Sequence, residues 1–315
     1  AEDVIPGPTP PVTADITPTT AQITLNNWKK KGFTLTDQEL TQIDQGFMPA
    51  QMSTAIDKIA KAIDTSILAN YRSIYNYVGT AGTTPFATST AEAQQARQRL
   101  NLAGAAEENR AIILDVNADA NAAGLPIFQQ YLQSGTTQTL ETGRIGFRVG
   151  FEWDFDLYMP RHTNTGGTGF ITSGTNALGA TTLTVSTGTV APAAGDIFTI
   201  AGDPQTYVVR AGATTASWPI SPGLQIAPPA SSAITFRASH QISLAIQQEC
   251  FGFASRPLAD VEFKGGSEIM MVPDPKTGLV LRLEVSRQYK QTLFEFDCLW
   301  GTNIVRPECG VRIAG

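Results

Sequence analysis

Charged residues are scarce in this sequence, and their scarcity limits what the chain can be. They make up 16% of its 315 residues, against about 25% in an average globular protein. Such a deficit occurs in proteins that keep much surface against partners, and also in β proteins rich in glycine and threonine. The net charge of −6 argues against a general nucleic-acid binder, because such proteins need basic residues that displace counterions from phosphates.

Cysteine and histidine are rare as well. The odd number and the spacing of Cys250, Cys298 and Cys309 imply neither a disulfide framework nor a zinc site, and fit folding in a reducing cytoplasm. His162 and His240 lie far apart in the sequence and give no metal spacing, so we expect neither to be catalytic. The sequence has no G-x-S-x-G and no phosphate-binding G-x-x-x-x-G-K-[ST] motif. No apolar run approaches the ~20 residues of a membrane span.

The first twenty residues are rich in proline and threonine. Proline excludes a helix here and favours an extended segment. A disordered tail and an arm that orders on a neighbouring subunit both remain open. The chain begins at Ala1 rather than at a methionine, so we expect a start that was trimmed, processed or left unobserved.

A charged cluster follows between two strand-like runs. Residues 22–28 and 32–36 flank Lys29, Lys30 and Lys31, which predicts a protruding hairpin with a charged tip. Such a run of lysines is usually solvated. In a shell it could instead reach an acidic face of the next subunit.

A long helix dominates the next part of the chain. The segment 36–39 resembles a helix start for a short helix that ends near Gly46. Pro49 then predicts the first turn of a helix over 49–78, whose apolar residues recur every three or four positions. At 1.5 Å per residue this helix would be roughly 43 Å long, enough for a spine that spans the subunit. Further helices are predicted over 89–102, with Ser89 and Glu92 as a capping box, and over 126–132.

Residues 147–158 show the clearest strand pattern, with apolar and polar side chains alternating over twelve residues. Glu152, Asp154 and Asp156 share the polar face, with neighbours ~7 Å apart. This spacing would suit an inverting glycosidase, or a hard cation with added ligands. We favour a solvated or partner-facing strand surface over both.

The composition changes between residues 165 and 238, where lysine and glutamate are absent. Short strands are predicted over 169–172, 181–186, 196–200, 206–210 and 233–237, with turn residues between them. They predict a small β-barrel or sandwich inserted into the host domain. Three function classes stay open: a carbohydrate-active enzyme based on the carboxylates, a β-rich surface adhesin, and a shell protein.

The last part of the chain predicts a long hairpin and a further strand. Residues 268–272 and 279–285 are strand-like and are joined by a turn that contains Asp274, Lys276 and Gly278. Phe294, Phe296, Cys298 and Trp300 then share one face of the following run. A long hairpin beside another strand is an extended surface rather than a pocket.

The order of several motifs resembles that of tailed-phage major capsid proteins. The resemblance lies in residues 274–278, 281–289, 296–301 and 305–308, with 255–260 as a companion motif. It is greatest to the P22 coat protein-like branch of the HK97-fold family. It covers nearly the whole chain, including the insertion at 194–203.

The resemblance implies an α+β, HK97-like capsid fold with an inserted small all-β domain. The implied parts are an N-terminal arm (1–21), an E-loop region (22–48), a P-domain (49–103, with its spine helix over 49–78, and 268–315), an A-domain (104–164 and 239–267) and the insertion (165–238). Family members usually carry more residues before the arm, so a start at Ala1 looks incomplete.

The implied function is structural. The chain would self-assemble into hexamers and pentamers of an icosahedral head that encloses double-stranded DNA without sequence-specific binding. The implied partners are other copies, portal and scaffolding proteins, and in some cases a cement or decoration protein, with no membrane. Assembly would take place in the host cytoplasm and the protein would reside in the virion. No catalytic, cofactor or metal residue is expected.

Contacts between subunits are expected at a small set of residues in the predicted hairpin and in the turn. These are Trp28, Lys29, Lys30, Lys31, Asp274 and Lys276.

Overall fold

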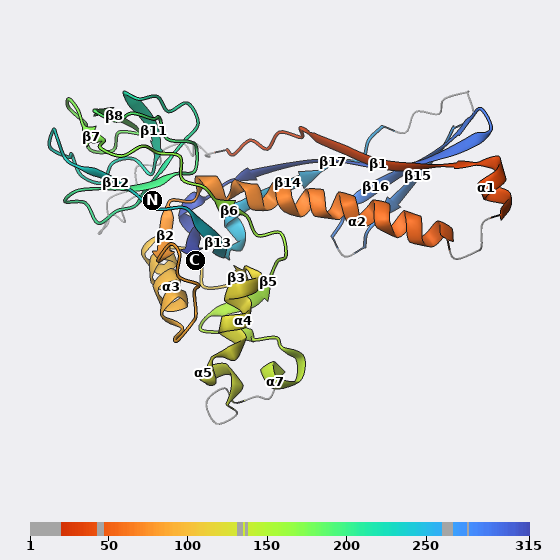
Figure 1. Cartoon of the computed structure of the whole chain (residues 1–315), viewed down its shortest axis with the longest axis horizontal. Helices are drawn as coiled ribbons and strands as arrows, with labels where there is room; N and C mark the ends of the chain where they lie inside the picture. Colours follow the sequence, from red (N-terminus) through yellow and green to blue (C-terminus); the bar gives the residue numbers. More distant parts are fainter. Residues whose placement is uncertain (1–19, 43–46, 131–134, 136–137, 260–266, 276) are drawn as a thin grey trace, which may run out of the picture.

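Three β-sheets organise the chain. The computed structural model describes residues 20–42, 47–130, 135, 138–259, 267–275 and 277–315. Figure 1 shows an elongated arm that is joined at its inner end to two lobes. The arm contains a five-stranded sheet, and the lobes contain a six-stranded and a seven-stranded sheet. The fold therefore mixes helix and strand, as the sequence predicts.

The arm is an antiparallel sheet with one long helix along it. The sheet runs in the order β1-β17-β16-β15, and β14 pairs with β17 further along that strand. Helix α2 (Phe47–Leu68) lies along one face. The strands are β1 (Asn27–Thr36), β14 (Phe251–Ser255), β15 (Ser267–Pro273), β16 (Val280–Gln288) and β17 (Gln291–Ile304).

The apolar stripe of α2 explains why the helix lies on this sheet. Ile59 and Ile63, one turn apart, pack with Phe296 and Trp300 in one buried cluster. The Trp300 side chain is fully buried, and its indole Nε1 donates a hydrogen bond to the Ser66 hydroxyl of α2 at 2.7 Å. Burying a tryptophan is favourable when its polar nitrogen also finds a partner.

The structure corrects the predicted hairpin around the lysines. Residues 27–36 form one continuous strand, in which Lys29 pairs with Cys298, Lys30 with Asp297 and Lys31 with Phe296 of β17. The lysines lie in the middle of this strand and not at a turn. The strand tolerates them because β1 is the edge of the sheet, where ammonium groups reach water on long side chains.

The structure also shortens the predicted long helix. Helix α2 ends at Leu68, and is followed by a 3₁₀ turn (Ala69–Ser73) and by strand β2 (Asn76–Gly79). The apolar residues keep their spacing beyond the end of the helix because they belong to two different cores. Ile59 and Ile63 pack in the arm, whereas Tyr71, Ile74 and Val78 pack in the seven-stranded lobe. There β2 forms parallel pairs with β18, which a helix could not do.

The seven-stranded sheet runs in the order β2-β18-β13-β3-β5-β4, with β6 paired to β13. Its strands beyond β2 are β3 (Arg110–Leu114), β4 (Gly146–Arg148), β5 (Phe151–Phe155), β6 (Arg161–His162), β13 (His240–Gln247) and β18 (Gly310–Ala314). Helices of this lobe are α3 (Ala91–Leu102), α4 (Val116–Gly124), α5 (Pro126–Gln129) and α7 (Gln138–Thr142). Short 3₁₀ turns at Gln248–Cys250 and Pro307–Cys309 precede β14 and β18.

Two further sequence predictions change at the level of single turns. Residues 147–158 are not one strand, because Val149 and Gly150 both have positive φ angles of 56° and 84°, which turn β4 back onto β5. The predicted capping box of α3 is wrong, since the helix is capped at Thr90. The helix start at Thr36 is confirmed in α1 (Asp37–Gln42), where the Thr36 backbone N–H donates to Glu39 Oε2 at 2.8 Å.

The strand-rich segment after residue 165 folds as an antiparallel sheet in the order β12-β9-β10-β11-β8-β7. Its strands are β7 (Ile171–Thr172), β8 (Thr182–Ser186), β9 (Ile197–Ile200), β10 (Tyr207–Val209), β11 (Ser217–Ser221) and β12 (Ile234–Phe236). Phe170, Phe198, Tyr207 and Trp218 form its aromatic core. The predicted strands are confirmed, while β11 was missed because Pro219 argues against a central strand. In the described ranges, no helix is both long and apolar enough to cross a membrane.

We expect replacement of Trp300 by alanine to destabilise the arm by about 3–5 kcal/mol, because it opens a cavity under α2 and leaves the Ser66 hydroxyl without its donor. Denaturant unfolding followed by circular dichroism measures this loss. Tyr289→Ala is the matched control, since Tyr289 is 86% exposed and its loss should stay within about 0.5 kcal/mol. An equal loss of unfolding free energy in both variants would show that Trp300 does not stabilise the packing of α2 on the sheet.

Candidate functional site

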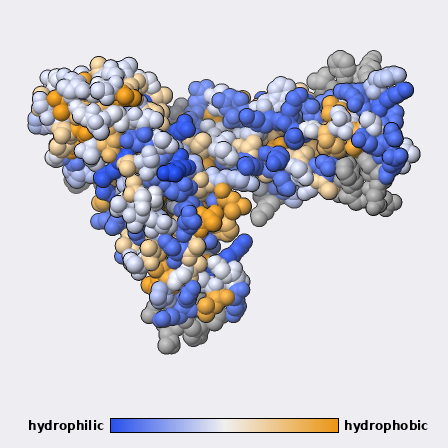
Figure 2. Space-filling view, viewed as in Figure 1, coloured by the Kyte–Doolittle hydropathy of each residue, from blue (hydrophilic) through white to orange (hydrophobic). Residues whose placement is uncertain are grey.

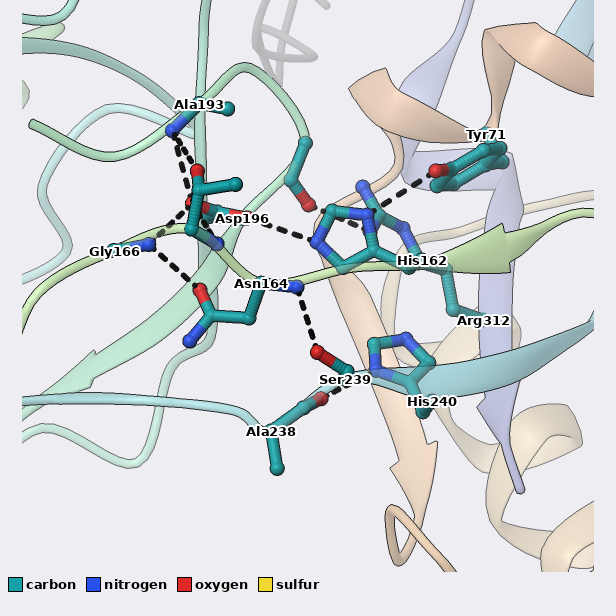
Figure 3. A network of polar contacts seen from close by, with 12 residues as sticks. Tyr71, His162, Asn164, Gly166, Ala193, Asp196, Ala238, Ser239, His240 and Arg312 are labelled. Atoms are coloured by element: carbon teal, nitrogen blue, oxygen red, sulfur yellow. Dashed lines mark hydrogen bonds and ion pairs between the residues drawn. The ribbon is translucent and has the colours of Figure 1, made fainter.

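A buried polar network lies where the six-stranded and seven-stranded sheets meet (Figure 3). Strand β6 pairs with β13 and sets His162 opposite His240. Asp196 lies just before β9, Tyr71 in the 3₁₀ turn after α2, and Arg312 in β18. The network therefore joins five segments that are distant in the sequence.

Asp196 is the acceptor at the centre of this network. Its carboxylate is fully buried and accepts hydrogen bonds from His162 Nε2 at 3.0 Å and from the backbone nitrogens of Ala193 at 2.9 Å and Gly166 at 3.1 Å. Burial by itself raises the pKa of Asp196, but these hydrogen bonds outweigh it and hold the pKa below its ordinary value. The aspartate is therefore charged and locked in place.

His162 links this carboxylate to Tyr71. The Tyr71 hydroxyl lies 3.1 Å from His162 Nδ1. With Nε2 as the donor to Asp196, the other ring nitrogen, Nδ1, accepts a hydrogen bond from the Tyr71 hydroxyl. The order tyrosine, histidine, aspartate could pass a proton, but His162 is 4% exposed and Asp196 not at all. At this burial neither group is accessible to a substrate, so we interpret the arrangement as a contact that holds the two sheets together.

Arg312 and His240 complete the junction. The fully buried Arg312 donates from Nη1 to the Gly195 carbonyl at 2.8 Å, and its guanidinium lies 5.0 Å from the centre of the Tyr71 ring. Burial lowers the pKa of Arg312 to about 9. Burial also lowers the pKa of His240 to about 4, while its Nδ1 lies 2.8 Å from the Ala238 carbonyl. At neutral pH Arg312 is thus charged and His240 is uncharged.

The structure divides the predicted contact residues of β1 between two faces of the arm. Trp28 and Lys30 pair with Leu299 and Asp297 and lie on the face away from α2. There the Trp28 indole donates to Asp297 at 3.1 Å although its side chain is 59% exposed, and Lys30 forms an ion pair with Glu295 at 3.1 Å. Lys29 and Lys31 lie on the opposite face, beside α2.

Of the two predicted contact residues in the turn, one has an internal role. Asp274 accepts a hydrogen bond from the Thr277 backbone N–H at 3.1 Å, which holds the turn between β15 and β16. Lys276 lies outside the described residues. Contact of these two residues with another subunit stays a prediction.

The carboxylate row is shorter than predicted. Glu152 and Asp154 are exposed on the same face of β5, whereas Asp156 follows the end of that strand. Burial, followed by the charge of Asp154, raises the pKa of Asp119. Within the described ranges, no group of three or more histidine, cysteine or acidic side chains could hold a metal ion.

Sequence reasoning missed the junction because its members are far apart in the chain. The two histidines are 78 residues apart in the sequence, although both border the segment poor in charge. That position at both ends of a compositional break was the available signal. Nothing in the sequence marked Tyr71, Asp196 or Arg312.

Solved structures share the fold of this chain. One is titled "Mycobacterium phage Che8", with 10% identity, a TM-score of 0.51, and coverage of 92% of this chain and 71% of that chain. Another is the capsid structure of the cyanophage P-SCSP1u, with 10% identity, a TM-score of 0.50, and coverage of 96% and 80%. No family model and no curated protein matches the chain. At this identity the likeness shows a shared fold.

We expect Asp196→Asn to lower the free energy of unfolding by about 3 kcal/mol. The amide nitrogen of the new side chain is a donor, and it would face groups that donated hydrogen bonds to the carboxylate. Thermal and urea unfolding measure this change. Asp57→Asn, an exposed change on α2, is the control and should be near neutral. If both substitutions were neutral, Asp196 would not hold the sheets together.

We also expect the free energy of unfolding to fall as the pH is lowered. Because the pKa of His240 is lowered from 6.5 to about 4 in the fold, the unfolded chain binds more protons between these values. The contribution of His240 is present above pH 6.5 and is lost as the pH falls to 4, by up to about 3 kcal/mol. Urea unfolding at several pH values measures this slope, and His240→Gln should flatten it. An unchanged slope in that variant would contradict the assignment.

Proposed function

We propose that this chain is the major capsid protein of a tailed phage, whose copies self-assemble into a closed shell. The fold shared with the P-SCSP1u capsid structure over 96% of the chain carries this proposal. The geometry supports it, because the polar network around Asp196 is buried. Its long strands, by contrast, present charged side chains at the surface.

The parts of an HK97-like subunit can be assigned to the three sheets. In this proposal the arm sheet and α2 are the P-domain with its spine, and β1 belongs to the E-loop region. The A-domain ranges supply β3 to β6 and β13 of the seven-stranded lobe and also β14 of the arm sheet, whereas β2, α3 and β18 of that lobe come from the P-domain ranges. The six-stranded sheet is the inserted domain. Relationship to the P22 coat protein-like branch is part of the same proposal and rests on the motif order in the sequence.

The assembly would consist of hexamers and pentamers in an icosahedral head around double-stranded DNA. A net charge of −6 suits a wall that encloses DNA without binding it tightly. Portal, scaffolding and, in some cases, cement proteins would be further partners. Assembly would occur in the host cytoplasm, and the protein would end up in the virion.

The alternatives have less support. A carbohydrate-active enzyme would rest on Glu152 and Asp154, which lie exposed on a strand. A glycan-binding adhesin would need exposed aromatic residues on the six-stranded sheet, but Phe170, Phe198 and Trp218 are buried in its core.

Electron microscopy of the purified protein tests the proposal. We expect closed particles, or rings of five and six copies, because each subunit would offer contacts that close by rotation. Analytical ultracentrifugation over a range of protein concentrations gives the fraction assembled. A chain that remained a monomer throughout, with and without co-expressed scaffolding protein, would overturn it.

A further inference from the structure

A basic groove runs along α2 on the side of β1. It has a volume of about 490 Å³ and is lined by Lys29 of β1, by Lys58 and Lys61 of α2, and by Trp300 among others. Lys58 and Lys61 are three residues apart and lie on the same face of the helix. The register of β1 turns Lys29 toward the helix side of the sheet. Three lysines thus line one groove of an acidic protein.

Within the described part of the chain, no acidic side chain forms an ion pair with these lysines. Among the residues that the structure describes, no ion pair includes Lys29, Lys58 or Lys61, whereas Lys30 on the other face pairs with Glu295. Lys61 lies 4.4 Å from the centre of the Tyr158 ring, which leaves its charge without an acid. A groove with three unpaired cations attracts an anionic surface.

The same chain also carries an exposed acidic surface. Glu152 and Asp154 are exposed on one face of β5, about 7 Å apart, and neither belongs to an ion pair in the described part of the chain. Exposed apolar side chains, Phe147 at 59% and Leu157 at 69%, flank this surface in sequence. Figure 2 shows apolar residues gathered in the corner between the arm and the lower lobe, through which the loop after β5 runs (Figure 1).

We propose that the groove of Lys29, Lys58 and Lys61 on one copy receives Glu152 and Asp154 of the next copy. This inference rests on the proposed function and names one contact within it. Neighbours on one face of a strand are about 7 Å apart, and residues three apart on a helix, such as Lys58 and Lys61, are about 5–6 Å apart. Long lysine side chains span this difference, so two ion pairs can form together. The exposed apolar residues beside β5 add area that charges alone would not bury.

The contact is heterologous, because the groove and the acidic surface are different parts of the chain. Head-to-tail contacts of this kind generate rings when the rotation closes, as a capsomer requires.

A second copy fits the groove better than nucleic acid does. Three lysines provide few of the phosphate contacts on which such binding depends, and every copy supplies one acidic surface for each groove.

Charge reversal tests the contact. We expect Lys29→Glu with Lys58→Glu to lower the yield of rings and particles at least about ten-fold, since a loss of 1.4 kcal/mol per contact is a factor of ten. Glu152→Lys with Asp154→Lys should do the same. All four substitutions in one chain should restore assembly, because attraction returns with its sign exchanged. Particle yield is measured by sedimentation and electron microscopy, and circular dichroism confirms that each variant folds.

Mixing the two reversed proteins separates a contact between copies from one within a chain. Each reversed protein repels its own kind, because its groove and its β5 surface then carry the same sign. In the mixture every contact between unlike proteins joins opposite charges, so rings that alternate the two proteins should form. Lys290→Glu and Glu108→Lys, exposed and outside both surfaces, are the controls and should assemble normally.

Several outcomes would overturn the inference while leaving the shell function intact. Wild-type particles with no rescue by the fourfold variant would do so, as would unimpaired assembly of either doubly reversed protein alone. Normal assembly of the lysine variant with loss of packaged DNA would assign the groove to nucleic acid. Failure of the wild-type protein itself to assemble would overturn the proposed function instead.

Discussion

The packing of α2 onto β17 is the contact on which the arm depends. Strand β17 is fourteen residues long and pairs with β1, β16 and β14. One of its faces carries Phe296 and Trp300 into the helix, and the other carries Glu295 and Asp297. Asp297 is 2% exposed because Arg282 binds both of its oxygens, at 2.9 and 2.6 Å, and Trp28 donates to it as well. The arm is thus apolar beneath the helix and ionic on its other face.

A different kind of contact holds the lobes together. Between the six-stranded and seven-stranded sheets, a buried aspartate collects donors from β6, from the loops at Gly166 and Ala193, and through His162 from Tyr71. A buried charge is tolerated when it is paired and its lone pairs are filled. Such a network fixes orientation more strictly than apolar packing, because each donor has one good direction. The relative placement of two sheets therefore depends on Asp196 and its donors.

Several charged side chains at the surface take part in neither the arm contact nor the contact between the lobes. Lys29 and Lys58 on the arm, and Glu152 and Asp154 on the lobe, have no ion-pair partner within the described part of the chain. When surface charges of both signs lack partners within a chain, ion pairs between two copies can lower the free energy of association. That gain is the physical basis of the proposed self-assembly, alongside the fold shared with phage capsid structures.

Local hydrophobic periodicity was enough to predict several helices and strands. The apolar stripe of α2, the helix start at Thr36 and the short strands after residue 165 depend on neighbours a few residues away, and all were predictable. The tertiary structure set the end of helix α2 at Leu68, because the next apolar residues pack with β18 in another core. It alone made Lys29–Lys31 part of a strand, since the pairing partner β17 lies more than 250 residues away. It alone brought His162, Asp196 and Arg312 together, because hydrogen bonds between distant segments leave no period in a sequence.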